Sequence, residues 1–321
     1  MMSRLRNILC LAVVVASVSA AADENPGGLL ASGRVDDAIS TLQVQLSNAP
    51  NNAEAYNLLC RSYLALGSWD RGIAACEKAV GLQPKNSRYH LWLGRIYGEK
   101  ADNVNFFSAA SLAGKVRREF EEAVSLAPDS AEARTDLAEF YLEAPGIVGG
   151  GQDKARAQAE VLLKLDPARA HWVYGRIAEK RKDPATAEHE YRSAIEVTHG
   201  DGNAWLNLGL FYRRAHRLDD MEDALRQAAS ADRIEPEVLV DAAETLHRAG
   251  RNFPEAIRLL RRYLAMDSKV ETAPAFKAHY VLGTLLEKQG DKQAAAQEYQ
   301  AALALAGGYV RAQEALDRLN R

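Results

Sequence analysis

The sequence lacks a strong net charge of either sign, and this absence narrows the choice of partners. Its 321 residues include 40 lysines and arginines against 43 aspartates and glutamates, which gives a formal net charge of −3. A chain so close to neutral lacks the basic excess typical of nucleic-acid binding, so we expect no nucleic acid as partner. Proline is scarce, with 10 residues, and 47% of the residues are hydrophobic. These values exclude a largely disordered chain and allow a sizeable core.

Long apolar runs are also absent, apart from one short run at the N-terminus. Arg4 and Arg6 precede it, residues 8–18 form it, and small residues follow at 19–21. A basic start, about 11 apolar residues and a small-residue cleavage site are typical of a secretory signal peptide. A membrane span needs roughly 20 apolar residues, and a short membrane anchor is the alternative. We predict an exported, periplasmic or alternatively extracellular chain without stable membrane insertion after cleavage.

The local motifs of common enzymes are missing as well. No histidine belongs to a His-Glu-x-x-His metal motif, and no serine-centred elbow or dinucleotide loop occurs. Three consecutive glycines, Gly149–Gly151, do precede a helical segment, as in phosphate-binding loops. However, Gln152 and Asp153 stand where a nucleotide loop has lysine and serine or threonine, and Asp153 is better placed to cap the helix. We therefore predict no enzyme activity, cofactor or metal, and a phosphate-binding enzyme is a remote alternative.

What the sequence does contain is a repeat. Seven windows of eight residues have a small central residue, most have a bulky first residue, and their starts lie 34, 44, 37, 34, 34 and 40 residues apart. They are YNLLCRSY (56–63), HLWLGRIY (90–97), RTDLAEFY (134–141), HWVYGRIA (171–178), WLNLGLFY (205–212), LVDAAETL (239–246) and HYVLGTLL (279–286). A second segment with apolar residues three and four apart follows each window. A period near 34 residues predicts stacked helical hairpins.

These windows resemble the tetratricopeptide repeat family over about residues 28–308. The family pattern Trp-x2-Leu-Gly-x2-Tyr is met by Trp205, Leu208, Gly209 and Tyr212. The segments SAASLAGKVRREFEEA and EAPGIVGGG resemble an exported bacterial subgroup, which implies no particular activity. The family resemblance implies an all-α, right-handed superhelical solenoid of about seven to eight hairpins, closed by a C-terminal capping helix.

The predicted organisation follows from these windows. It consists of a signal peptide (1–21), an N-terminal partial repeat or cap (22–52), tandem repeats (53–308) and a capping helix (309–321). The repeats are 53–86, 87–130 with an inserted loop, 131–167 with the glycine-rich loop, 168–201, 202–235, 236–275 and 276–308.

The resemblance also implies that a ligand lies on the concave face, which the first helices form. The residues predicted there are Asn57, Arg61, Trp92, Arg95, Trp172, Arg176 and Asn207. Arginine and tryptophan commonly anchor binding surfaces, so this face could hold an acidic or extended peptide. The alternative is that these charges are solvated and paired between neighbouring repeats, since acidic residues occupy equivalent places.

The predicted function is therefore a non-catalytic scaffold or adaptor of the bacterial cell envelope that binds a protein or peptide of unknown identity. The alternative is binding of an envelope polysaccharide, with Trp92 and Trp172 stacked on sugar rings and the arginines beside acidic groups.

Two residue pairs complete the predicted sites. Phe106 and Phe107 lie in the inserted segment 101–115, on the same edge as the glycine loop. They either protrude as a partner contact or pack beneath the second helix, and packing is favoured because exposed aromatic pairs are uncommon. Cys60 and Cys76 lie level on antiparallel helices, so they could form a disulfide in an oxidising compartment, with reduced core cysteines as the alternative.

Overall fold

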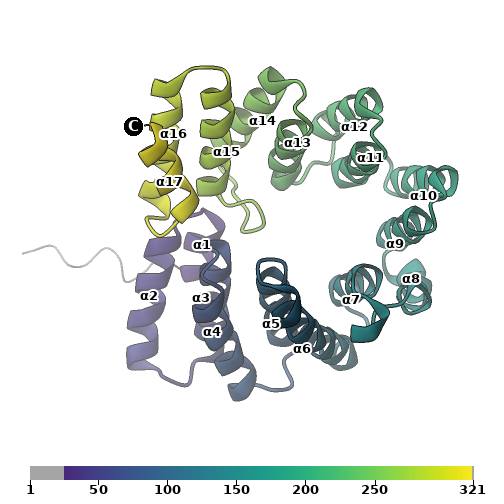
Figure 1. Cartoon of the computed structure of the whole chain (residues 1–321). Coiled ribbons are helices and arrows are strands. Elements are labelled where there is room, and N and C mark those ends of the chain that lie inside the picture. The colour runs from purple at the N-terminus through teal and green to yellow at the C-terminus, as the bar shows by residue number, and fades with distance from the viewer. Residues whose placement is uncertain (1–24, 320–321) are drawn as a thin grey trace, which may run out of the picture.

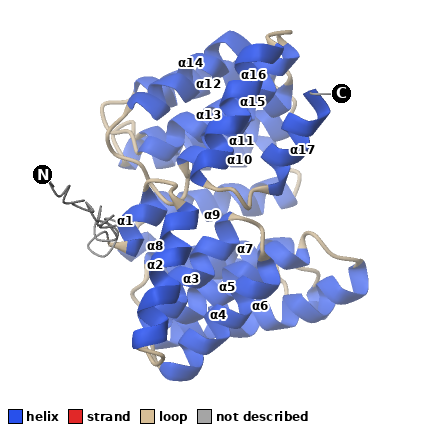
Figure 2. Ribbon diagram, turned by 90° about the vertical axis from the view of Figure 1, so that its left-hand side faces the viewer, coloured by secondary structure: helices blue, strands red, loops and turns tan. Residues whose placement is uncertain are grey.

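The computed structural model describes residues 25–319, so the predicted signal peptide at 1–21 lies outside the described residues. Within 25–319 every element is helical, and short loops join the helices (Figure 2). The helices are α1 (Pro26–Ala31), α2 (Val35–Asn48), α3 (Ala53–Ala65), α4 (Trp69–Leu82), α5 (Ser87–Ala101), α6 (Phe106–Leu126), α7 (Ala131–Glu143), the 3-10 helix η1 (Gly146–Val148), α8 (Gln152–Leu165), α9 (Pro167–Lys180), α10 (Pro184–Val197), α11 (Gly202–Arg214), α12 (Leu218–Ser230), α13 (Pro236–Ala249), α14 (Phe253–Ala265), α15 (Ala275–Lys288), α16 (Lys292–Leu305) and α17 (Val310–Leu319).

Polar caps begin many of these helices. Asn52, Ser130, Asp166 and Asp291 each accept a hydrogen bond at 3.0–3.2 Å from a backbone N–H in the first turn of the following helix. Such caps satisfy amide groups that have no partner inside the helix. The chain is thereby divided into short helices of similar length, as a hairpin repeat requires.

Consecutive helices pair into hairpins, and the hairpins stack side by side (Figure 1). The first helices, α3 to α15 with odd numbers, face the centre, and their partners lie outside (Figure 1). Small residues permit this close pairing, because a Cβ on Gly94 would lie 2.4 Å from the Phe120 ring. The prediction of an all-α superhelical repeat solenoid is confirmed.

The two ends of the solenoid meet, so the stack forms a ring (Figure 1). The Gly307 N–H donates to the Asp36 carboxylate at 2.7 Å, across 271 residues of sequence. One buried cluster joins Leu30 and Leu66 from the N-terminal end to Phe276 and Tyr309 from the C-terminal end. The terminal hairpins therefore bury their apolar faces against each other, in addition to the capping that α17 gives α16.

The insertion in the second repeat is mostly helix, which corrects the predicted inserted loop at 101–115. Helix α5 ends at Ala101, and α6 begins at Phe106 and runs for 21 residues. Asn105 starts α6 by accepting the Ser108 N–H at 3.1 Å. The extra residues lengthen α6 at its N-terminal end, because this segment is rich in alanine and contains no proline.

Candidate binding surfaces

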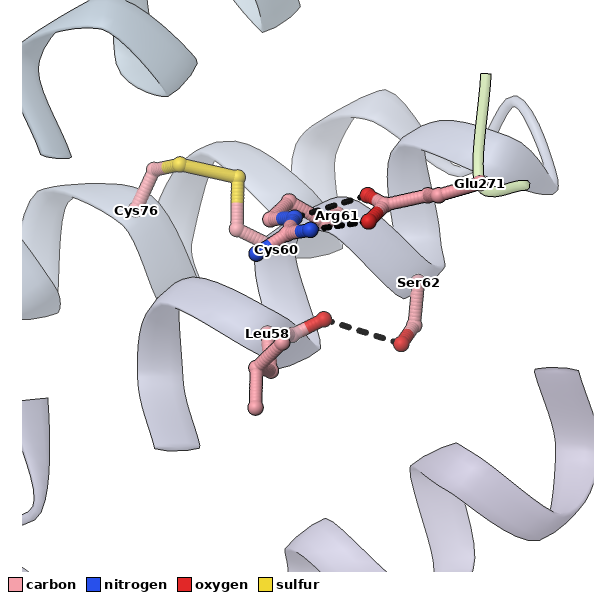
Figure 3. The surroundings of a disulfide bond; sticks show 6 residues. All are labelled: Leu58, Cys60, Arg61, Ser62, Cys76 and Glu271. Carbon is pink, nitrogen blue, oxygen red and sulfur yellow. Dashed lines mark hydrogen bonds and ion pairs between the residues drawn. A yellow bond between two sulfur atoms is a disulfide. The ribbon is translucent and has the colours of Figure 1, made fainter. Parts of the chain in front are cut away.

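Arg61 on α3 is held inside the closure of the ring. Its Nε donates to Glu271 Oε1 at 2.7 Å, and a second nitrogen donates to the other carboxylate oxygen (Figure 3). Glu271 lies in the connection between α14 and α15. The Arg61 guanidinium also lies 4.8 Å from the centre of the Trp92 ring. This arginine therefore already has an anion and an aromatic partner within the chain.

Arg95 on α5 has the same kind of environment. Its Nε donates to Asp136 at 2.6 Å and its NH2 group to Glu132 at 2.7 Å, both on α7. Its guanidinium lies 4.7 Å from the Trp92 ring, which therefore contacts two guanidinium groups. Burial lowers the pKa of Arg95, but Asp136 and Glu132 together outweigh it, so the pKa is raised.

The third predicted arginine is paired too. Arg176 on α9 donates to Glu143 on α7, and Lys180 donates to the other oxygen of Glu143 at 2.7 Å. Arg61, Arg95 and Arg176 thus all pair with carboxylates from other hairpins. This is the alternative interpretation of the sequence, in which charges pair between repeats. Each of the three guanidinium groups already has a carboxylate partner, although Arg176 Nε itself has none.

The prediction that Asn57 binds a ligand is wrong. Its side chain is fully buried, and neither polar atom has a hydrogen-bond partner. It cannot contact a ligand on the surface, although its place in the repeat predicted that it would. Asn207 on α11 is half-buried and its side chain makes no hydrogen bond, so it remains available. Trp172 is partly buried and packs against both large core clusters.

Helices α11 and α13, which lie toward the centre of the ring, carry charged side chains without an ion-pair partner (Figure 1). The Arg213 side chain forms no ion pair, its Nε has no partner, and burial together with Arg248 lowers its pKa. On α13, burial and the neighbouring Glu244 and Glu237 raise the pKa of Asp241 to about 6. Helices α11 and α13 pack against each other. Asp241 is one of the acidic residues at places equivalent to the predicted binding residues. Arg213 is not predicted from the sequence, because it lies just outside the repeat window 205–212.

The cysteine pair lies in the first complete hairpin. Cys60 on α3 and Cys76 on α4 are joined as a disulfide with their Cα atoms 5.2 Å apart (Figure 3). Both cysteines are fully buried. The small side chain at each position lets α3 and α4 approach closely enough for this bond.

The glycine loop has no free amide groups for a phosphate. The N–H groups of Gly149, Gly150 and Gly151 donate to the carbonyl oxygens of Gly146, Pro145 and Tyr141 at 3.0, 3.2 and 2.8 Å. Asp153 does not cap α8, which corrects that expectation, because Gly151 occupies the cap position and no side chain bonds to it. Within the described chain, no three histidine, cysteine or acidic side chains are arranged to hold a metal ion.

Phe106 and Phe107 protrude, so the favoured prediction that they pack beneath the helix is wrong. Their exposed fractions are 75% and 85%. They sit in the first turn of the lengthened α6, beyond the end of the shorter α5, so no neighbouring helix reaches them. The expectation that this segment and the glycine loop are neighbours is confirmed, because α6 and η1 line one cleft.

Among residues 25–319, no helix combines the length and apolar character needed to cross a membrane. Two family models described as tetratricopeptide repeat match residues 29–96 and 241–310. A search of curated proteins found no match.

Several solved structures are similar to this chain. Yeast Tom70 is similar with a TM-score of 0.53 and 14% identity, over 89% of this chain and 58% of Tom70, so this chain spans little more than half of that structure. TTC0263, a thermophilic TPR protein of Thermus thermophilus, has a TM-score of 0.49 and 19% identity over 58% of this chain and 97% of its own. A tetratricopeptide repeat protein from Parabacteroides merdae has a TM-score of 0.42 and 16% identity, over 84% of this chain and 99% of its own. At these identities the likeness to Tom70 concerns the fold alone.

Proposed function

This chain belongs to the tetratricopeptide repeat family, whose repeats mark a protein-interaction scaffold, and we propose that it binds a peptide segment of a partner protein on the inner face of its ring, in the bacterial cell envelope. We define the inner face as the side of α9, α11 and α13 that is directed toward the centre of the ring (Figure 1).

One observation carries this proposal: the polar groups of adjacent first helices that the fold itself leaves unpaired. Arg213 and Asp241 form no ion pair, and the Asn207 side chain makes no hydrogen bond. An unpaired, partly buried guanidinium is unfavourable, and so is an ionised carboxylate beside other carboxylates. A peptide with carbonyl, carboxylate and ammonium groups would satisfy both.

The three arginines predicted to bind a ligand serve another purpose. Arg61, Arg95 and Arg176 already join neighbouring parts of the ring, so they position first helices rather than grip the ligand. The same contacts favour a peptide over a polysaccharide, because two guanidinium groups already lie over the Trp92 ring.

Two features support an exported location. The sequence of residues 1–21 has the order of a secretory signal peptide. The Cys60–Cys76 disulfide is typical of proteins that fold in an oxidising compartment such as the periplasm. The extracellular medium would satisfy both features equally well.

In-cell photocrosslinking tests the proposed inner-face site. A photoreactive residue replaces Asn207, and the matched control replaces Glu160, an exposed residue on the outer helix α8. We expect one protein to be captured from position 207, not from 160, and to be lost when Arg213→Ala and Asp241→Asn are added. Capture of glycan alone, or equal capture from both positions, would contradict the proposal.

A further inference from the structure

A cleft of about 710 Å³ lies on the edge of the ring between α5, α6, α7 and η1. One wall is the lengthened part of α6, with Ala109, Ala110 and Ala113. The opposite wall is η1 with its flanks, including Pro145 and Val148. Val116, Phe120 and Phe140 also line it and are buried in the core. Its volume is in the range of cavities that bind ligands in other proteins.

Large apolar side chains are exposed at both walls of this cleft. Phe106 on α6 and Ile147 on η1 both line it and are 75% and 93% exposed, and Phe107 beside them is 85% exposed. Elsewhere in residues 25–319 no aromatic side chain is comparably exposed. An exposed apolar patch that borders an apolar cleft typically marks an interaction surface.

The η1 wall is held in place by contacts from α6, α7 and α8. The Gly151 N–H donates to the Tyr141 carbonyl at 2.8 Å, and the Lys154 ammonium donates to the Gly149 carbonyl at 2.8 Å. The Arg117 side chain of α6 packs directly against Gly149. The cleft is therefore formed before any partner arrives, which lowers the entropic cost of binding.

The charges of the cleft are predominantly negative. Its charged lining consists of one arginine, Arg95, and five carboxylates: Glu99, Asp102, Asp136, Glu139 and Glu143. Arg95 forms an ion pair with Asp136, and Glu143 forms ion pairs with Arg176 and Lys180. Glu99, Asp102 and Glu139 are exposed and form no ion pair with any described residue. An occupant with positive side chains would complement these three carboxylates.

We propose that this cleft is a second protein-binding site, which takes an amphipathic α-helix of a partner protein with an apolar face flanked by lysine or arginine. The alanines of α6 allow the backbone of a helix to approach closely, while Phe106, Phe107 and Ile147 cover its apolar face from two sides. The inference shares with the proposed function the premise that the chain is a protein scaffold, but it concerns a different surface.

A defined peptide probes this site. The probe is a fluorescent, helical peptide of about 18 leucines and lysines with one leucine face, and a matched peptide has glutamate in place of lysine. Fluorescence anisotropy with the full chain gives the dissociation constants. We expect the lysine peptide to bind, and the glutamate peptide to bind at least about tenfold more weakly.

Two paired variants locate the binding. Phe106→Ser with Phe107→Ser should weaken binding of the lysine peptide by more than about tenfold. The control, Val44→Ser with Val310→Ser, changes exposed apolar positions elsewhere and should leave the binding unchanged. Glu99→Gln with Asp102→Asn should weaken binding of the lysine peptide about fivefold and make that binding less dependent on salt. Asp129→Asn with Asp232→Asn is the matched charge control.

Three results would overturn the inference: equal binding of both peptides, unchanged binding by the phenylalanine variant, or salt-insensitive binding. Sedimentation of the chain alone can give a fourth contradicting result. If the chain self-associates and the phenylalanine variant does not, a second copy of the chain occupies the cleft. The inner-face variant Arg213→Ala with Asp241→Asn should bind the lysine peptide normally. If the chain without these substitutions captures no protein from position 207 but binds the lysine peptide, the inner-face proposal alone is refuted. Capture from position 207 without peptide binding would refute the cleft alone.

Discussion

Arg61 and Glu271 form a two-point ion pair although 210 residues separate them in the chain. Their side chains are only 10% and 17% exposed. The contact joins α3, in the first complete hairpin, to the connection that precedes α15, in the last. With the Asp36–Gly307 hydrogen bond, it holds the two ends of the solenoid together.

Breaking this pair should weaken the closure. We expect Arg61→Ala to lower the free energy of unfolding by about 2 kcal/mol, because Glu271 would keep a largely buried charge without a partner. A double-mutant cycle with Glu271→Gln should give a coupling energy of about 1–2 kcal/mol, measured by urea denaturation. Small-angle scattering should show a larger radius of gyration for the variant. Additive effects of the two substitutions would mean that the pair does not hold the ring.

The disulfide should stabilise the fold by lowering the conformational entropy of the unfolded chain. For a loop of about 16 residues, we expect reduction, or Cys60→Ala with Cys76→Ala, to cost about 3 kcal/mol. Thiol alkylation of chain taken from the producing cell tests the compartment at the same time. We expect both cysteines to resist alkylation until a reductant is added to the denatured chain. Immediate labelling of both after denaturation would contradict the proposed export.

Stability should fall at alkaline pH because of a buried His–Glu pair. His90 Nδ1 lies 2.7 Å from Glu119 Oε2, and Nε2 lies 2.9 Å from the Pro84 carbonyl oxygen. The hydrogen bond to Glu119 raises the pKa of His90 despite burial. This stabilisation is present below the unfolded histidine pKa near 6.5 and is lost as pH rises through the folded pKa.

The comparison that isolates this pair is between wild type and His90→Gln. We expect the difference in unfolding free energy to be larger at pH 6 than at pH 9. His189→Gln serves as the control, because His189 is exposed and its side chain makes no hydrogen bond. A difference that stays constant with pH would show that the fold does not raise the pKa of His90.

Gly150 should be required for the η1 wall of the cleft. A Cβ at this position would lie 1.8 Å from the Ala144 carbonyl oxygen, so the loop must move if alanine replaces the glycine. We expect Gly150→Ala to destabilise the chain by about 1–3 kcal/mol. Gly114→Ala on α6, where a Cβ meets nothing within 4 Å, should be neutral or stabilising by up to ~1 kcal/mol. Thermal denaturation of both variants makes the comparison, and equal melting temperatures would refute the role of Gly150.

The repeat architecture was predictable because its determinants are local. Trp205, Gly209 and Tyr212 belong to a pattern that recurs with a period near 34 residues, and each hairpin contacts mainly its neighbours. Ring closure was not predictable, because it rests on pairs such as Asp36 and Gly307, whose proximity only the accumulated curvature of all the hairpins creates.

The environments of the surface residues were not predictable either, because they too depend on contacts between hairpins. The repeat pattern placed Arg61 and Arg95 on first helices, but their pairing depends on carboxylates contributed by other hairpins. Asn57 is buried although its helix position indicated exposure. Phe106 protrudes because the insertion extends α6 past the end of α5. The sequence of the insertion does not indicate how far α6 extends. Cys60 and Cys76 were recognisable as a pair because they lie in one hairpin.

The central claim is that the inner face of the ring holds a segment of a partner protein. Isothermal titration of the segment mapped by crosslinking at position 207 tests it most directly, with wild type, Asn207→Ala/Arg213→Ala and the outer-face control Glu160→Ala. We predict one segment per chain and a loss of about 2 kcal/mol of binding free energy, more than tenfold in affinity, for the inner-face variant alone. Equal affinities for all three proteins would contradict the account.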